Sequence, residues 1–267
     1  MCMNFSLNNL TVPEVIKATQ DNMIGLMHTW GGLSESLQVI EDENCFRIKS
    51  PIKHPLFNNI LKTKVDQDVH GYVDSIINDY KSQQIPFLWR IWDHDEPDEI
   101  GSVLLENGAQ QIPGTILMAI NLDSFQPLTQ PLPELTIQTI GMKRDAVNFS
   151  QCACTSFGIP KQFLEPIGEL IHKEDPNIVN FVGYVDDTVV STATLYYCNG
   201  LAGIYNVATL LDFQGKGIGM DIMTALLFKA KHDGYHTAIL HATPAGLRLY
   251  EKLGFIKYGE MIQYLFT

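Results

Sequence analysis

The chain has 267 residues, of which 45% are hydrophobic and 18% charged, so it is long enough to bury one large core or two smaller ones. Its formal net charge of −12 argues against a protein that wraps nucleic acid, because phosphates repel a surface without a dense basic patch. No apolar run approaches the roughly 20 residues of a membrane span, and no basic region followed by an apolar core opens the sequence, so we expect a soluble cytoplasmic protein.

The first half of the sequence contains one clear helix followed by one clear strand. Apolar side chains recur at helical spacing at Val69, Val73, Ile76, Ile77 and Tyr80, which predicts a helix with one buried face. The β-rich run at 85–92 then predicts a strand. A proline-rich stretch at 126–133 predicts an extended linker between two folding units, so we expect domains at 1–125 and 134–267.

The second half alternates strands and helices. Asp186 and Asp187 predict a hairpin turn between two of the strands. We expect strands at 135–140, 177–185, 188–197, 201–209, 236–241 and 257–266, and helices at 143–157, 161–172 and 245–253, with one more helix ending near 233–234.

The five cysteines show no spacing typical of a disulfide framework. Cys152 and Cys154 would point to different sides of a helix. We therefore expect reduced thiols and no metal site. The cysteines stand at positions 2, 45, 152, 154 and 198.

A glycine-rich loop at 214–219, with the sequence QGKGIG, lies between a β-rich run and an amphipathic helix. Glycine lets the backbone approach a ligand closely. The free amides that open the following helix, at the positive end of its dipole, suit a phosphate group. The pattern therefore predicts a phosphate-binding loop, and a glycine turn with a purely structural role is the other interpretation.

Spacing separates the kinds of phosphate loop. A dinucleotide fold uses GxGxxG, whereas these glycines fall as GxGxG and no acidic residue lies near position 239 to hold a ribose. A Walker loop requires Ser or Thr after its lysine, whereas Gly217 follows Lys216. Both nucleotide loops are therefore disfavoured.

The segment from Asn206 to Phe255 resembles the Gcn5-related N-acetyltransferase (GNAT) family. Gln214, Gly217 and Gly219 satisfy the family's coenzyme A (CoA) loop, (Arg/Gln)xxGxGxx, and residues 250–255 match its YE(K/R)LGF string. The resemblance implies an α/β (α+β) fold with a mixed, mostly antiparallel sheet flanked by helices. It also implies acetyl-CoA as cosubstrate and direct attack of an amine on the thioester. Gln214 stands where many relatives have arginine, which removes one charge from the phosphate site.

By the same resemblance, acetyl-CoA binds where the strands at 201–209 and 236–241 splay apart. The backbone around Val207 and Ala208 is expected to pair with pantetheine and to polarise the acetyl carbonyl. Thr243 is expected either to contact pantetheine or to cap the next helix. The expected CoA-binding residues are Val207, Ala208, Thr209, Gln214, Gly215, Lys216, Gly217, Ile218, Gly219, Met220 and Thr243.

Tyr250 matches the family tyrosine that protonates the departing thiolate. A phenol with a pKa of roughly 10 can donate to a thiolate whose pKa is roughly 8.5. The other interpretation of Tyr250 is an aromatic side chain on the buried face of a helix. For the general base, the sequence offers His241 at the end of its strand, a water chain, or by analogy a carboxylate at Thr267.

The first half resembles a second, degenerate copy of the same fold. Gly108 and Gly254 lie in similar strings 146 positions apart, and Asn59 and Asn206 lie 147 apart. Carrying the offset of 147 back from the glycine loop reaches 67–72, where two of the three glycines are lost and nearby aspartates would repel a pyrophosphate. We therefore expect a tandem arrangement in which the N-terminal copy binds no CoA. Accidental similarity of two α/β segments is the alternative.

The leading hypothesis is an acetyl-CoA dependent N-acetyltransferase that acts on a primary amine of a small molecule or peptide, with Tyr250 as general acid. The alternative is a non-catalytic CoA-binding or sensor module with a paired interaction domain. A purely structural interaction protein is a third class. The sequence fits a monomer or a homodimer, and it names neither the amine nor the acyl chain.

Overall fold

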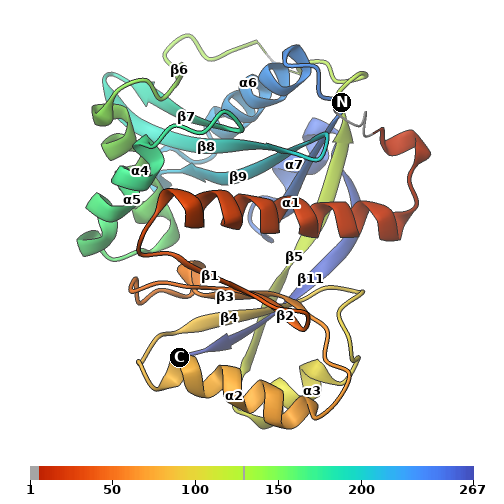
Figure 1. Cartoon of the computed structure of the whole chain (residues 1–267). Coiled ribbons are helices and arrows are strands. Elements are labelled where there is room, and N and C mark those ends of the chain that lie inside the picture. The colour runs from red at the N-terminus through yellow and green to blue at the C-terminus, as the bar shows by residue number, and fades with distance from the viewer. Residues whose placement is uncertain (1–5, 129) are drawn as a thin grey trace. The chain divides into compact units, whose positions relative to one another are not determined.

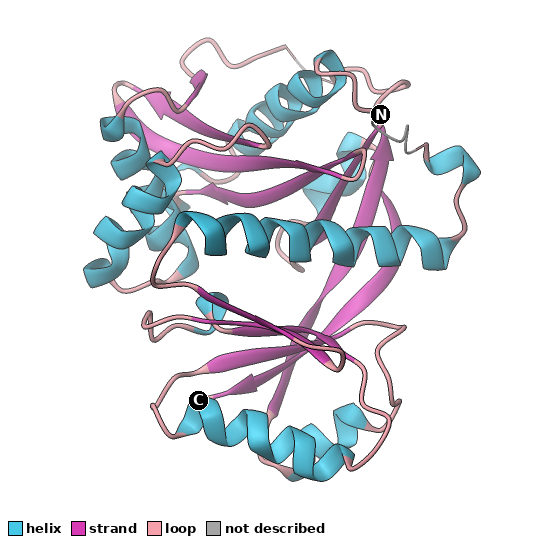
Figure 2. Cartoon of the chain, in the orientation of Figure 1, coloured by secondary structure: helices cyan, strands magenta, loops and turns pink. Residues whose placement is uncertain are grey.

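The structure, a computed structural model, describes residues 6–128 and 130–267 (Figure 1). It divides into two compact units. The first-half unit comprises Thr11–Leu117 and Tyr258–Thr267, and the second-half unit comprises Met118–Lys257 with the described residues before Thr11. Both units combine helices with strands, as Figure 2 shows. The expectation of an α/β fold is confirmed.

The first-half unit has a mixed sheet in the order β1-β2-β3-β4-β11. Strands β3 and β4 are parallel, and the other neighbouring pairs in this order are antiparallel. Its elements are α1 (Val12–Leu33), β1 (Gln38–Glu41), β2 (Cys45–Lys49), η2 (Pro55–Phe57), β3 (Asn59–Thr63), α2 (Val69–Lys81), β4 (Phe87–Ile91), α3 (Ile100–Glu106), and parts of β5 (Gln110–Asn121) and β11 (Ile256–Phe266).

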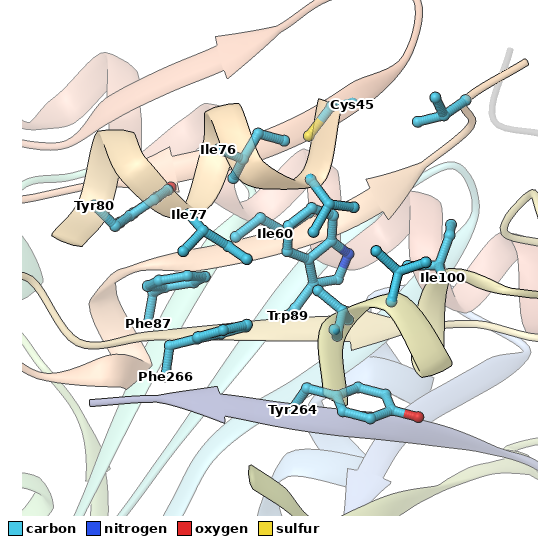
Figure 3. Close-up of a cluster of buried hydrophobic side chains, with 14 of the residues drawn as sticks. Cys45, Ile60, Ile76, Ile77, Tyr80, Phe87, Trp89, Ile100, Tyr264 and Phe266 are labelled. Atoms are coloured by element: carbon cyan, nitrogen blue, oxygen red, sulfur yellow. The ribbon is translucent and has the colours of Figure 1, made fainter. Parts of the chain in front are cut away.

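Helix α2 buries the apolar face that its sequence predicts, from Val69 to Tyr80. That face packs on the cluster drawn in Figure 3, where Phe87 of β4 stacks between Tyr80 and Phe266. The ring centroids are 4.5 Å and 4.6 Å apart. Burial of this apolar and aromatic surface is the main force that holds helix α2 on the sheet.

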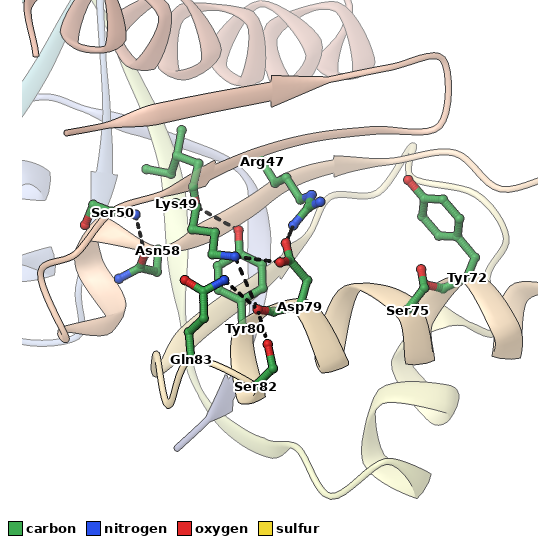
Figure 4. A network of polar contacts seen from close by, with 11 residues as sticks. Arg47, Lys49, Ser50, Asn58, Tyr72, Ser75, Asp79, Tyr80, Ser82 and Gln83 are labelled. Carbon is green, nitrogen blue, oxygen red and sulfur yellow. Dashed lines mark hydrogen bonds and ion pairs between the residues drawn. The ribbon is translucent and has the colours of Figure 1, made fainter. Parts of the chain in front are cut away.

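A polar network fixes the last turn of α2 on β2 (Figure 4). The carboxylate of Asp79 accepts from Arg47 at 2.5 Å and from Lys49 at 2.6 Å. The hydroxyl of Tyr80 donates to the carbonyl of Ile48 at 2.8 Å. Both cations also lie over the Tyr80 ring, 5.6 and 5.5 Å from its centroid. These charge-assisted contacts set the position of α2 along the strand.

The second-half unit has a sheet in the order β10-β9-β8-β7-β6, in which only β9 and β10 are parallel. The predicted hairpin turn is confirmed, since Asp186 and Asp187 adopt positive φ values of 46° and 61° between β7 and β8. The elements are η1 (Leu7–Asn9), β6 (Thr136–Thr139), α4 (Lys143–Phe157), η3 (Lys161–Phe163), α5 (Leu164–His172), β7 (Ile178–Val185), β8 (Thr188–Cys198), β9 (Leu201–Thr209), η4 (Leu211–Phe213), α6 (Ile218–His232), β10 (Thr237–Ala242) and α7 (Leu247–Leu253).

The two halves of the chain share one order of elements. In each, three antiparallel strands are followed by a helix, a strand parallel to the third, a short helix and a long strand. The offset of 147 positions that the sequence gives for Asn59 and Asn206 also carries α3 at Ile100–Glu106 onto α7 at Leu247–Leu253. The weak sequence repeat is therefore accompanied by a repeat of the secondary structure.

The compact units are not contiguous in sequence, because β5 and β11 contribute residues to both of them. The predicted ranges 1–125 and 134–267 are contiguous, and they stay a prediction about folding domains. Of the predicted linker at 126–133, Thr129 lies outside the described residues, and the rest forms neither helix nor strand. The end of the linker is bonded to α6, since the amide of Leu132 donates to the carboxylate of Asp221 at 2.7 Å.

The cysteines of the described chain are free thiols. Burial raises the pKa of Cys45 and of Cys152 to about 12, which keeps both as neutral, unreactive thiols. Cys2 lies outside the described residues. None of the helices in the described part of the chain is long and apolar enough to span a membrane.

Candidate functional site

Strands β9 and β10 stop pairing before either of them ends. Their parallel register runs from Ala202 opposite Ala238 to Ile204 opposite Leu240. Strand β9 then continues to Thr209 and β10 to Ala242 without pairing to one another. Pairing of β10 with β9 therefore ends at Ile204, which is where the sequence predicts that the two strands splay, and we call the edge of β9 at 206–209 its open edge toward β10.

A β-bulge lies in β9 at the start of this open edge. On the β8 side, Thr192 is opposite Ala208 and Thr194 is opposite Tyr205, so two residues of β9 stand opposite one of β8. One of the two is Asn206, whose φ of 52° is in the left-handed region. The bulge turns the backbone of β9 locally, beside the predicted binding residue Val207.

Buried hydroxyl and amide groups hold the bulge. Thr192 Oγ1 donates to the carbonyl of Asn206 at 2.9 Å, and Asn206 Nδ2 donates to Thr194 Oγ1 at 3.1 Å. Thr194 Oγ1 donates in turn to Asn180 Oδ1 at 2.7 Å. Thr192 and Thr194 are fully buried, so the network has no water to replace a lost contact.

Replacing Thr194 with valine is expected to destabilise the protein by about 1–3 kcal/mol, because Asn206 Nδ2 and Asn180 Oδ1 each lose a buried partner. Urea unfolding measures the change. Thr188→Val is the matched control, since Thr188 is exposed at the start of the same strand. Equal loss of stability in the two variants would contradict the role assigned to the network.

The glycine loop follows β9 after the short 3-10 helix η4. Gly215 and Gly217 both have left-handed φ values, 74° and 92°, which only glycine adopts without strain. The side chain of Gln214 turns back and donates to the carbonyl of Thr209 at 3.0 Å, so it anchors the loop to the end of β9. Lys216 is exposed, and its ammonium lies 5.0 Å from the centroid of the Phe213 ring. The loop is thus a surface turn of fixed backbone shape with one cation beside it.

The first amides of helix α6 lie at this loop. Its first hydrogen bonds run from Met220 N and Asp221 N to the carbonyl of Gly217. The amides of Ile218 and Gly219 precede that ladder, as the first amides of any helix do. They coincide with the positive end of the helix dipole, so the loop and first turn are suited to an anionic group.

Gly219 lies close to the side chain of Leu249 on α7. A Cβ at this position would lie 3.2 Å from Leu249 Cδ2 and 3.9 Å from Thr209 Oγ1. The glycine therefore allows the start of α6 to approach both α7 and the end of β9. Through this contact the predicted phosphate loop and the helix that carries Tyr250 lie against one another.

Tyr250 is on the buried side of α7, with 8% of its surface exposed. Its ring packs under Gly246, where a Cβ would come within 2.8 Å of Cε2, and its centroid is 5.9 Å from that of Phe255. Burial raises the pKa of Tyr250 to about 12. The phenol therefore stays protonated at neutral pH, as a proton donor must, while its packing also fits the other interpretation of a core aromatic.

His241 and Thr243 lie at the end of β10. The His241 ring is edge-on to Tyr205, the first residue of β9 beyond the paired region, with 6.1 Å between centroids. Thr243 is exposed, and its carbonyl accepts from Gly246 and Leu247 at the start of α7. The helix begins at Gly246 without a side-chain cap, so the Thr243 hydroxyl does not fill the capping role that the sequence allowed.

Asp221 lies beside the candidate site, and no sequence pattern singles it out. It is buried in the first turn of α6, and its carboxylate accepts from the amide of Leu132. An acidic residue in a first helical turn is a general helix signal, so nothing local distinguishes it. Within residues 6–128 and 130–267, no group of three or more His, Cys, Asp or Glu side chains is placed to hold a metal ion.

Known proteins share both the family pattern and the fold. Residues 147–255 match the family model described as the acetyltransferase (GNAT) family. The chain is similar to a GCN5-related N-acetyltransferase from Kribbella flavida, with 14% identity, a TM-score of 0.69, and coverage of 93% of this chain and 95% of that one. The chain has a GNAT-like fold.

Two further solved structures share the GNAT-like fold. A GCN5-related N-acetyltransferase from Sphaerobacter thermophilus is 14% identical, with a TM-score of 0.60 and coverage of 84% of this chain and 80% of that one. A tandem GNAT protein from the clavulanic acid biosynthesis pathway is 11% identical, with a TM-score of 0.54 and coverage of 83% and 78%. No curated protein sequence matches the chain. At these identities the solved structures establish the fold alone.

Proposed function

We propose that the chain is an acetyl-CoA dependent N-acetyltransferase that transfers an acetyl group directly to a primary amine of a small molecule or peptide. The observation that carries the proposal is the open edge of β9, followed after η4 by the glycine loop and the first amides of α6. The match of residues 147–255 to the acetyltransferase family model supports it, because these residues include both features.

Acetyl-CoA supplies an activated acyl thioester to this site. The backbone of Val207, Ala208 and Thr209 on the open edge would hydrogen-bond the pantetheine arm and the thioester carbonyl. Donors fixed by the bulge act where negative charge develops in the transition state. The amides from Gly215 to Gly219, which precede the first hydrogen bonds of α6, would bind the pyrophosphate, with Lys216 adding a positive charge and Gln214 holding the loop. The amide of Met220, which the sequence predicts as a further contact, donates to the carbonyl of Gly217 instead.

The transfer needs two proton movements. The amine nitrogen attacks the thioester carbon, a C–N bond forms, and the C–S bond breaks to release a thiolate. Tyr250, whose phenol is protonated at neutral pH, would give its proton to that thiolate. The proton lost by the amine would pass to His241 or to water, since His241 ends the strand that borders the open edge.

We also propose that the two halves of the chain are tandem copies of one fold and that only the second binds acetyl-CoA. The shared order of elements and the common offset of 147 support a tandem origin. At the start of α2, where α6 has Gly217, the first half has Asp68, whose carboxylate accepts from the amide of Gly71 at 3.1 Å. That carboxylate therefore occupies one of the amides at the start of α2, and its negative charge would repel a pyrophosphate.

Acetyl-CoA binding and acetyl transfer are tested separately. Acetyl-CoA at about 100 times its Kd is expected to raise the stability of the protein by roughly 2.7 kcal/mol, which is read as a higher thermal midpoint. With a panel of primary amines, at least one is expected to release free CoA thiol above background. A stabilising shift without transfer to any amine would favour the alternative of a CoA-binding or sensor module, and no shift at all would remove the acetyl-CoA site.

A further inference from the structure

In the first half of the chain, strand β3 also continues beyond its parallel pairing with the next strand. Strands β3 and β4 pair in parallel only at Asn59 with Leu88 and at Ile60 with Trp89, although β3 continues to Thr63. On its other side β3 carries a bulge at Leu61, since Phe46 is opposite Lys62 and Arg47 is opposite Ile60. The end of parallel pairing and the adjacent bulge are the two features that define the open edge of β9.

The chain itself pairs with this edge beyond Ile60. The amide of Glu96 donates to the carbonyl of Thr63 at 3.1 Å, and the amide of Val65 donates to the carbonyl of Glu96 at 3.0 Å. Lys64 and Glu96 form a parallel bridge. The backbone groups that would otherwise be open to a ligand are therefore bonded to the segment that follows β4.

The carboxylate of Asp95 takes further N–H groups at the same edge. It accepts from the amide of Thr63 at 3.3 Å, from the amide of Trp92 at 3.0 Å and from Gln20 Nε2 of α1 at 3.4 Å. Asp95 is 6% exposed, and burial raises its pKa to about 7 against the hydrogen bonds, which lower it. A buried carboxylate that accepts three hydrogen bonds is a specific structural contact, because a buried polar group without partners would destabilise the fold.

The carbonyl of the bulge residue is also taken. Leu61 O accepts from Trp92 Nε1 at 2.9 Å and from Gln20 Nε2 at 3.0 Å. Both donors are buried, Trp92 with 1% of its surface exposed and Gln20 with none. Residues 92–96, which follow β4, therefore bond the edge of β3 through the backbone of Glu96, the carboxylate of Asp95 and the indole of Trp92.

We propose that residues 92–96 are a built-in occupant of the open β3 edge, which fill the place that acetyl-CoA takes on β9 under the proposed function on which this inference rests. The chain then has one acetyl-CoA site, although both halves carry the strand geometry for one. In the first half, Asp68 accepts from an amide in the first turn of α2, and residues 92–96 bond the edge of β3 at Thr63 and Val65.

Hydrogen exchange of single amides, with and without saturating acetyl-CoA, tests the occupant. The amides of Thr63, Val65 and Glu96 are expected to exchange slowly without ligand and to remain unchanged when acetyl-CoA is added. Amides at 206–209 and 215–219 are expected to slow by at least tenfold on addition. Slower exchange at Thr63 or Val65 with acetyl-CoA would show an open first-half edge and overturn the proposal.

Asp95→Asn provides the matching variant, because the amide NH₂ would face one of the N–H groups that the two carboxylate oxygens accept. In Asp95→Asn, exchange at the amide of Thr63 is expected to quicken by at least tenfold. Asp93→Asn is the control, since Asp93 is exposed, and it is expected to leave that exchange rate unchanged. Equal effects in the two variants would overturn the proposal. Trp92→Phe, which keeps a ring but removes the donor to Leu61, gives the same readout if Asp95→Asn does not fold.

The outcomes separate this inference from the proposed function. If acetyl-CoA protects no amide in either half while Asp95→Asn still quickens exchange at Thr63, the acetyl-CoA site on β9 fails and the self-closed β3 edge stands. If acetyl-CoA protects 206–209 and Thr63 together, the acetyl-CoA site stands and the occupant fails.

Discussion

Tyr250→Phe is expected to lower kcat for acetyl transfer by about 100-fold or more while leaving the KM for acetyl-CoA within a few-fold, since general acid catalysis contributes on this scale. The substitution keeps the ring, which packs under Gly246 and against Phe255, and removes only the hydroxyl. Steady-state kinetics with the best amine of the panel measure both constants.

Tyr184→Phe is the control for Tyr250→Phe. Tyr184 belongs to the same unit but lies on strand β7, and its hydroxyl bonds to Asp145 and Asn148. Its kcat should stay near that of the wild type. An unchanged kcat in Tyr250→Phe would leave Tyr250 as a core aromatic, the interpretation that its burial also fits.

The pKa of Tyr250 adds a test by pH. Because burial raises this pKa to about 12, the phenol remains protonated between pH 6 and 9, and the rate should not fall in this range through loss of its proton. A rise in rate with pH over the same range would report the group that accepts the proton of the amine. His241→Asn is then expected to remove that rise if His241 is the base.

Gly217→Val is expected to raise the Kd for acetyl-CoA by about tenfold or more. Gly217 has a φ of 92°, and a left-handed conformation costs an ordinary residue roughly 1–2 kcal/mol, with β-branched residues the least tolerant. The loop would relax to a new backbone path and withdraw its amides from the pyrophosphate. Isothermal titration with acetyl-CoA gives the Kd directly.

The opposite end of the same helix supplies the control. Gly234 follows α6 with a φ of 89° and open space around its Cβ position, so Gly234→Val introduces a comparable backbone strain. Stability is expected to fall in both variants, and affinity for acetyl-CoA only in Gly217→Val. A matched loss of affinity would mean that the loop acts through the stability of α6 and not through its amides.

Local sequence pattern predicts most of the second half. The helix at Lys143–Phe157 and the strands from 177 onward were predicted from apolar periodicity and turn residues, and the structure confirms them within one or two residues at each end. The long helix α1 is missing from the sequence analysis. Its Thr11 and Glu14 form a capping box with Pro13 in the first turn, which was a readable signal, but glycines and β-branched residues dilute its periodicity.

The candidate site divides in the same way. The glycine loop and Tyr250 are visible in sequence because each belongs to a short string with a fixed spacing. The bulge at Asn206 and its partner Thr194 are not visible, since the bulge depends on the register between two strands. Gln20 donates to Asp95, 75 positions further along the chain, and both side chains bond to β3. Only the folded chain brings these residues together.

The division of β11 between the units constrains how the protein is made. Residues 262–266 pair with 87–91 of β4, so the sheet of the first-half unit takes its neighbour for β4 from the end of the second half of the sequence. During synthesis, β4 therefore lacks its pairing with β11, and Phe87 lacks its contact with Phe266, while some 170 further residues emerge. An unpaired, apolar strand edge invites association with other chains. We expect the nascent first half to depend on chaperones, and a fragment expressed without residues 258–267 to aggregate.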